Sequence, residues 1–232
     1  MTTNSRTESI LADEGRTFDA YVSVPENPNG SAIIVLQEIF GVTGTIRKVA
    51  DHFAGDGFLA FAPDLFWRMQ SGVQLGHSKE DMALAFRFLQ RFDEAKAVLD
   101  IGRTVAHVRA QRGFGGAVAV VGMCLGGKLA YLAAARLDVD AAVGYYGVGI
   151  ETALEEAPNV KHPLLLHFGG QDKYAPPVAV AKIAAALADN PNVTIHTYPE
   201  ADHGFYTRGD PAIINLAHER TARFLDQSLP AK

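Results

Sequence analysis

Short apolar runs alternate along the chain with longer segments of helical periodicity, and this alternation constrains the fold more than any other feature. The runs are rich in β-branched and aromatic residues, which is typical of strands buried in a parallel sheet. They are residues 31–36, 58–62, 117–121, 141–146 and 163–168. The helical segments are residues 45–56, 79–91, 94–111, 125–136, 178–189 and 212–227. This order predicts an α/β fold in which helices cover both faces of a mostly parallel central sheet.

The remaining segments are less regular. Residues 18–24 and 193–198 mix polar and apolar side chains, as expected of edge or terminal strands. Residues 64–79 are the least regular part of the interior, and they form either a loop over a site or a plain surface connection. A chain of 232 residues with 48% hydrophobic content can bury a substantial core. We therefore expect a single domain over residues 1–232.

Charge and composition exclude several kinds of partner. The formal net charge is −5, so the chain lacks the basic excess that a nucleic acid or an anionic membrane surface would attract. The polar start lacks the apolar core of a secretory signal, and no apolar run approaches the roughly 18 residues of a spanning helix. These features predict a cytoplasmic protein with neither a nucleic-acid nor a membrane partner. They leave the oligomeric state open, a monomer included.

Cys124 is the only cysteine of the chain. An intramolecular disulfide is therefore impossible, and a thiolate metal cluster would need other ligands. A lone intracellular cysteine is either inert packing or a reactive group, and free cysteine is among the most buried residue types. The residues around Cys124 must therefore distinguish an inert cysteine from a reactive one.

Cys124 stands where a buried strand runs into glycines and then into a helix, in the pattern Gly122-Met-Cys124-Leu-Gly126. A nucleophile on a sharp strand-to-helix turn needs small residues two positions before and after it, so that the chain can fold back past itself. At the start of the helix, unpaired N–H groups would stabilise a thiolate, and the amide of Leu125 would stabilise a developing oxyanion. The alternative is a glycine-rich turn that carries a buried cysteine.

A nucleophile of this kind needs a base and a carboxylate that orients the base. Asp172 stands in a glycine-containing loop after the run 163–168, and His203 stands in a loop after residues 193–198. The order nucleophile, acid, histidine is that of α/β-hydrolases. Asp202 is a poor rival for Asp172 because it is adjacent to His203, whereas Glu200 remains an alternative.

With these residues the chain resembles the dienelactone hydrolase family, the carboxymethylenebutenolidases, over most of its length. The segments that carry the resemblance are QEIFG at 37–41, APDL at 62–65, GMCLGG at 122–127, GYYG at 144–147, GQD at 170–172 and DHGF at 202–205. A joint match of this kind is specific to the family and less specific to one substrate.

The resemblance implies an α/β-hydrolase fold that needs neither a cofactor nor a metal. It implies a triad of Cys124, His203 and Asp172, with the backbone amides of Leu125 and Ile39 as the oxyanion hole. It also implies a role for Glu38, which in this family accepts a hydrogen bond from the resting thiol and takes its proton when substrate displaces it. The alternative is a solvated loop glutamate, since glutamate is usually exposed.

The chain departs from the family pattern where a substrate carboxylate would bind. Family members that act on dienelactones hold this carboxylate with two arginines, and the first of them falls near Met82 in this chain. Arg208 is the candidate for the second, although it lies one residue further from His203 than the pattern requires. Candidates for an apolar wall of the pocket, each of which could instead be core, are Phe40, Trp67, Tyr146 and Phe205.

The leading prediction is hydrolysis of a small enol-lactone or ester by acylation of Cys124 and deacylation by water activated at His203. The resemblance associates this activity with the degradation of aromatic compounds. One alternative is a broad carboxylesterase or thioesterase on the same scaffold. Another is a non-catalytic ligand-binding protein that uses Cys124 as a redox sensor.

Overall fold

The computed structural model describes residues 4–229, and the chain divides into two compact units, one up to Val118 and the other from Ala119. Each unit is described by itself, and the single domain expected from the sequence stays a prediction. Among the described residues, no helix is both long and apolar enough to cross a membrane.

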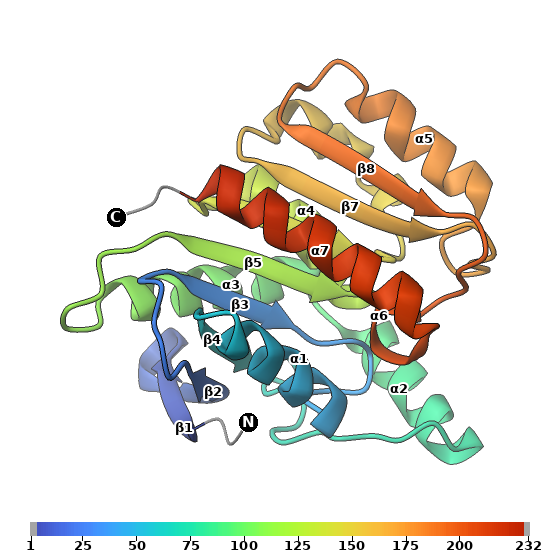
Figure 1. Cartoon of the computed structure of the whole chain (residues 1–232). Helices are drawn as coiled ribbons and strands as arrows, with labels where there is room; N and C mark the ends of the chain where they lie inside the picture. Colours follow the sequence, from blue (N-terminus) through green and yellow to red (C-terminus); the bar gives the residue numbers. More distant parts are fainter. Residues whose placement is uncertain (1–3, 230–232) are drawn as a thin grey trace. The chain divides into compact units, whose positions relative to one another are not determined.

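The first unit contains four strands in the order β1-β2-β4-β3, in which β2 is antiparallel to both of its neighbours and β3 is parallel to β4. These strands are β1 (Asn4–Leu11), β2 (Thr17–Val24), β3 (Ala32–Leu36) and β4 (Leu59–Pro63). The helices are α1 (Gly44–Gly55), α2 (Lys79–Arg91) and α3 (Glu94–Arg109), and a 3-10 turn, η1 (Asp13–Gly15), joins β1 to β2. Helix α1 packs on β2, β3 and β4, whereas α3 packs on β1 and β3 from the other face (Figure 1).

The second unit is a parallel arrangement of four strands in the order β5-β6-β7-β8. They are β5 (Val118–Met123), β6 (Ala141–Tyr145), β7 (Leu164–Gly169) and β8 (Val193–Tyr198). The helices are α4 (Leu125–Arg136), α5 (Pro177–Leu187), α6 (Phe205–Arg208) and α7 (Pro211–Ser228), with 3-10 turns η2 (Ile150–Thr152) and η3 (Leu154–Asn159). Helix α7 crosses one face of these strands and α4 lies on the other (Figure 1).

The strand arrangement of the second unit brings several candidate site residues to one edge. Because all four strands are parallel, their carboxyl ends meet at one edge, and the loops that follow them share that edge. Cys124 follows β5, Tyr146 follows β6, Asp172 comes shortly after β7, and His203 comes shortly after β8. The strands and helices confirm the predicted α/β class, and one strand, β1, was not predicted.

Candidate active site

Strand β5 ends in a strained turn that carries Cys124. Cys124 has φ 56° and ψ −113°, and α4 begins at the next residue. A side chain on a backbone of positive φ is unfavourable and persists only where its surroundings enforce it. Gly122 is required for this turn, because a Cβ atom there would lie 1.9 Å from the carbonyl oxygen of Gly126. The local geometry is that of the predicted nucleophile elbow.

Backbone hydrogen bonds hold the elbow in place. The N–H of Cys124 donates to the carbonyl of Tyr145 at 3.0 Å, which ties the elbow to the end of β6. The carbonyl of Cys124 accepts from the N–H groups of Gly127 at 3.0 Å and Val148 at 3.3 Å. Leu125 is the first residue of α4, and the N–H groups of a first turn have no acceptor within their own helix. The amide of Leu125 therefore suits the predicted oxyanion donor.

The structure places Asp172 against His203. Asp172 is 1% exposed, and its Oδ2 lies 2.8 Å from Nδ1 of His203. Its Oδ1 accepts from the backbone N–H groups of Tyr174 at 2.8 Å and Ala175 at 3.1 Å. Burial by itself raises the pKa of Asp172, but the hydrogen bond and charge of His203 and the two backbone N–H groups outweigh burial and lower the pKa. Asp172 is therefore ionised and is the acceptor in this contact, so Nδ1 of His203 donates the hydrogen bond that orients the ring.

The two rival carboxylates lie elsewhere. Asp202 accepts a hydrogen bond from the backbone N–H of His203 at 2.7 Å rather than from its ring. Glu200 is exposed, and the ring of His203 is bonded to Asp172. The loops of the acid and the histidine are also joined, because the N–H of Gly170 donates to the carbonyl of Tyr198 at 2.8 Å. A Cβ atom on Gly170 would lie 2.6 Å from the carbonyl oxygen of Pro199, so this close approach requires glycine.

Comparison with known proteins identifies the family. The profile of the dienelactone hydrolase family matches residues 18–229. The chain belongs to the dienelactone hydrolase family. A carboxymethylenebutenolidase of Pseudomonas putida is 38% identical over 222 residues, which cover 94% of this chain and 94% of that protein. The predicted family and enzyme class, an ester or lactone hydrolase, are thereby confirmed.

Solved structures support the fold. A crystal structure of a Klebsiella pneumoniae protein covers 97% of this chain and 99% of its own, with a TM-score of 0.81 and 28% identity. A dienelactone hydrolase from Anabaena variabilis covers 98% of this chain and 99% of its own, with a TM-score of 0.73 and 20% identity. The chain therefore has the α/β-hydrolase fold that the sequence predicted.

In this family member, two tyrosine rings pack edge-on against the imidazole of His203. The rings of Tyr146 and Tyr174 each have their centroid 4.9 Å from that of His203, at interplanar angles of 67° and 63°. Tyr146 is completely buried and has a positive φ of 39°, whereas Tyr174 is 54% exposed. Tyr174 was not among the site residues predicted from the sequence, and its position two residues after Asp172 was the available signal.

Two candidates for the apolar wall, Tyr146 and Phe205, lie within the site as packing residues. Phe205 is 2% exposed, and its ring centroid lies 5.4 Å from that of Tyr146 and 5.0 Å from that of Tyr198. A third candidate, Phe40, is 6% exposed and packs edge-on against His77 at 4.5 Å. Their contact with substrate stays a prediction, and the observed contacts give them a role in positioning.

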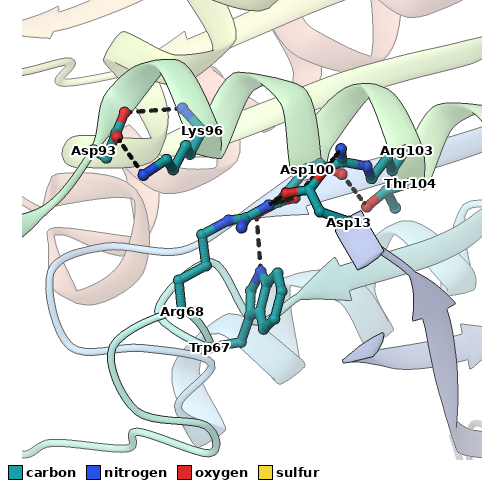
Figure 2. Close-up of polar contacts among 8 residues, drawn as sticks. All are labelled: Asp13, Trp67, Arg68, Asp93, Lys96, Asp100, Arg103 and Thr104. Carbon is teal, nitrogen blue, oxygen red and sulfur yellow. Dashed lines mark hydrogen bonds and ion pairs between the residues drawn. The ribbon is translucent and has the colours of Figure 1, made fainter. Parts of the chain in front are cut away.

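The fourth candidate, Trp67, belongs to a buried ionic cluster in the first unit. Figure 2 shows its indole Nε1 donating to Asp100 Oδ2, at 2.8 Å. Asp100, on α3, is 0% exposed and also accepts from Arg68 Nε at 2.8 Å and from Arg103 Nη1 at 2.7 Å. Asp13 pairs with both arginines from the 3-10 turn η1. These contacts give Trp67 a packing role, and its contact with substrate stays a prediction.

Arg208, the candidate for recognition of a carboxylate, lies close to the backbone that follows His203. A Cβ atom on Gly204 would lie 2.3 Å from Cζ of Arg208, so the guanidinium lies directly against Gly204. Gly204 also has a φ of 79°, which glycine adopts without strain. Arg208 Nη1 donates to Thr207 Oγ1 at 3.3 Å. The guanidinium is thereby held against the residue adjacent to His203.

Glu38 and Ile39 lie in the first unit, shortly after β3. Glu38 is 4% exposed and Ile39 is 8% exposed, so Glu38 is not the solvated loop glutamate considered from the sequence. The preceding Gln37 is fully buried, and its Oε1 accepts from the N–H of Leu65 at 3.0 Å. The segment after β3 is thereby tied to the segment after β4.

The second unit contains a buried polar cluster around His167. His167 on β7 is 0% exposed, and its ring nitrogens lie 2.9 Å from the Tyr198 hydroxyl and 3.1 Å from Thr221 Oγ1. The ring of His167 stacks on that of Tyr145 at 4.6 Å. Burial holds the pKa of His167 well below its ordinary value, so this histidine is neutral and structural. It is not a rival for His203 as the base.

Proposed function

We propose that this protein hydrolyses an enol-lactone or ester through the triad Cys124, His203 and Asp172, with an acyl-cysteine intermediate. The observation that carries the proposal is the 2.8 Å contact between Asp172 Oδ2 and His203 Nδ1, in loops that follow neighbouring parallel strands. Cys124 follows β5 at the same edge, on an elbow bonded to the end of β6. The three residue types and their order suit acyl transfer.

The proposed reaction has two steps. The thiol proton of Cys124 passes by way of Glu38 to Nε2 of His203, and the resulting thiolate attacks the carbonyl carbon. The bond to the leaving oxygen breaks, and that oxygen takes the proton from Nε2 of His203. The acyl group then forms a thioester with Cys124. A water molecule gives a proton to Nε2 of His203 and attacks the thioester, which releases the acid and restores the thiol. In a lactone, the leaving oxygen remains attached to the acyl group.

The thiol favours activated substrates. A thiolate attacks a carbonyl readily but is itself expelled easily when the other leaving group is poor. Enolate and phenolate oxygens leave readily, whereas amide nitrogen does not. The proposed substrates are therefore enol-lactones and activated esters, and amides are not among them.

The family resemblance supplies two further parts of the proposal. The amides of Leu125 and Ile39 would stabilise the oxyanion of the tetrahedral intermediate. Glu38 would take the proton of the resting thiol when substrate binds. Its burial supports this role, because a buried carboxylate needs a hydrogen-bond donor or a proton.

Trapping the intermediate tests the mechanism. Protein mixed with p-nitrophenyl acetate and quenched in acid should carry one acetyl group, and peptide mass spectrometry should locate it on Cys124. Protein first alkylated with iodoacetamide at Cys124 should release no p-nitrophenol by turnover. Full turnover after complete alkylation, or an acetyl group on a serine that is kinetically competent, would contradict the proposal.

Arg208 should recognise a carboxylate on the substrate. We expect Arg208→Ala to reduce the preference for an anionic lactone over its neutral methyl ester by about ten- to a hundredfold, because one charge-assisted hydrogen bond is lost. The measurement compares kcat/KM for both substrates. Arg223→Ala, which removes an exposed arginine of α7, is the control for net charge. A strong preference for the anion that survives Arg208→Ala would assign recognition to another cation.

A further inference from the structure

Tyr174 contacts His203 and is also exposed to solvent. Its ring lies edge-on to the catalytic imidazole, with 4.9 Å between the centroids, and yet 54% of the residue is exposed. Tyr146 makes a comparable contact with His203 and is completely buried. Of these two rings, Tyr174 is therefore the one with free surface to offer to a substrate.

The triad itself fixes the position of Tyr174. Its backbone N–H donates to Asp172 Oδ1 at 2.8 Å, on the carboxylate whose other oxygen holds His203. The next N–H, that of buried Ala175, donates to the same oxygen at 3.1 Å. Pro176 and Pro177 follow and restrict the backbone into α5. The backbone of Tyr174 is thus held by hydrogen bonds to the same carboxylate that orients the imidazole of His203.

The proposed reaction gives the exposed face of the Tyr174 ring a role in substrate binding. His203 protonates the departing oxygen, so a group that packs against the imidazole lies close to the portion of the ester that leaves. An exposed aromatic ring there would stack against a flat leaving group.

We infer that Tyr174 is a specificity-determining residue, which selects esters and lactones whose leaving oxygen belongs to an aromatic or similarly flat, conjugated group. The inference rests on the proposed function, because it assumes that His203 protonates that oxygen. It goes beyond the proposed function by naming the kind of leaving group and the residue that recognises it.

The test compares two activated acetates, phenyl acetate and trifluoroethyl acetate, of which only the first has an aromatic leaving group. Tyr174→Ala should lower kcat/KM for phenyl acetate about three- to tenfold more than for trifluoroethyl acetate, because only phenyl acetate loses a stacking partner. Tyr174→Phe should retain the wild-type ratio, since the ring rather than the hydroxyl makes the contact. Leu216→Ala, at a 42% exposed apolar residue of α7, is the matched control and should leave the ratio unchanged.

The outcomes separate this inference from the proposed function. Equal losses for both acetates in Tyr174→Ala would show that the ring only positions His203. No loss for either acetate would show that the ring neither positions His203 nor contacts the leaving group. Either outcome would overturn the inference and leave the proposed function standing. Turnover that persists in Cys124→Ala, or wild-type protein that hydrolyses neither acetate, would overturn the proposed function and the inference with it.

Discussion

Replacing Cys124 with alanine should lower kcat/KM for p-nitrophenyl acetate by about four to six orders of magnitude, to the level that binding and the oxyanion hole supply alone. The side chain of Cys124 is the proposed nucleophile, and the chain has no second thiol to replace it. Steady-state hydrolysis by purified variant and wild type measures the loss. Circular dichroism and the urea midpoint verify that the variant is folded.

When residues act as one unit, the losses of activity caused by replacing each of them are not additive. This non-additivity distinguishes a triad from three residues that contribute independently. The double variant Cys124→Ala with His203→Ala should therefore be little worse than Cys124→Ala alone. Asp172→Asn should lose less than either single variant at Cys124 or His203, because Asp172 orients the imidazole without touching the acyl group. Losses that multiply in the double variant would mean that His203 does not act through Cys124.

Asp100→Asn should lower the free energy of unfolding by about 2–4 kcal/mol, because it leaves Arg68 and Arg103 without their buried counter-charge. Asp100 is fully buried and accepts hydrogen bonds from both arginines and from Trp67 (Figure 2). The side chains of Arg68 and Arg103 are 16% and 26% exposed and both still pair with Asp13, so we expect less than the full loss of a completely buried pair. Urea unfolding gives the value.

Asp93→Asn is the matched control, since it makes the same substitution at the start of the same helix. Asp93 caps α3 through Lys96 N–H and pairs with the Lys96 side chain on the surface (Figure 2). Asparagine caps a helix as well as aspartate, and an exposed pair contributes little, so the midpoint should stay at the wild-type value. Equal effects of the two substitutions would show that the cluster around Asp100 does not stabilise the unit.

The strands and helices could be predicted from the sequence because burial leaves a periodic pattern. The predicted helices 79–91 and 125–136 coincide with α2 and α4, and the other predicted helices differ from the observed ones by at most two residues at either end. Strand β1 left no such pattern. Of its residues only Ile10 is buried, and the strand is held by antiparallel pairing with β2 along its whole length. Pairing of backbone groups at an edge is invisible to a search for apolar runs.

The candidate site was predictable where it depends on local order along the chain. Cys124, Asp172 and His203 each follow a strand, and parallel strands bring such loops to one edge. Trp67 was not predictable in the same way, because an aromatic residue in an irregular segment suits a pocket wall and a core equally well. Its partner Asp100 lies 33 residues further along the chain. Contacts between side chains so far apart leave no signal in a single sequence.

The backbone of Cys124 has a consequence for how such a protein changes over generations. A side chain at φ 56° and ψ −113° costs about 1–3 kcal/mol, and glycine would adopt these angles without that penalty. A lineage under selection for stability alone would therefore drift toward glycine at position 124. Cys124→Gly should show the released strain as added stability in an inactive protein. On the proposed mechanism, only selection for the reaction itself would retain the cysteine against this drift, so position 124 would record whether a descendant still works as an enzyme.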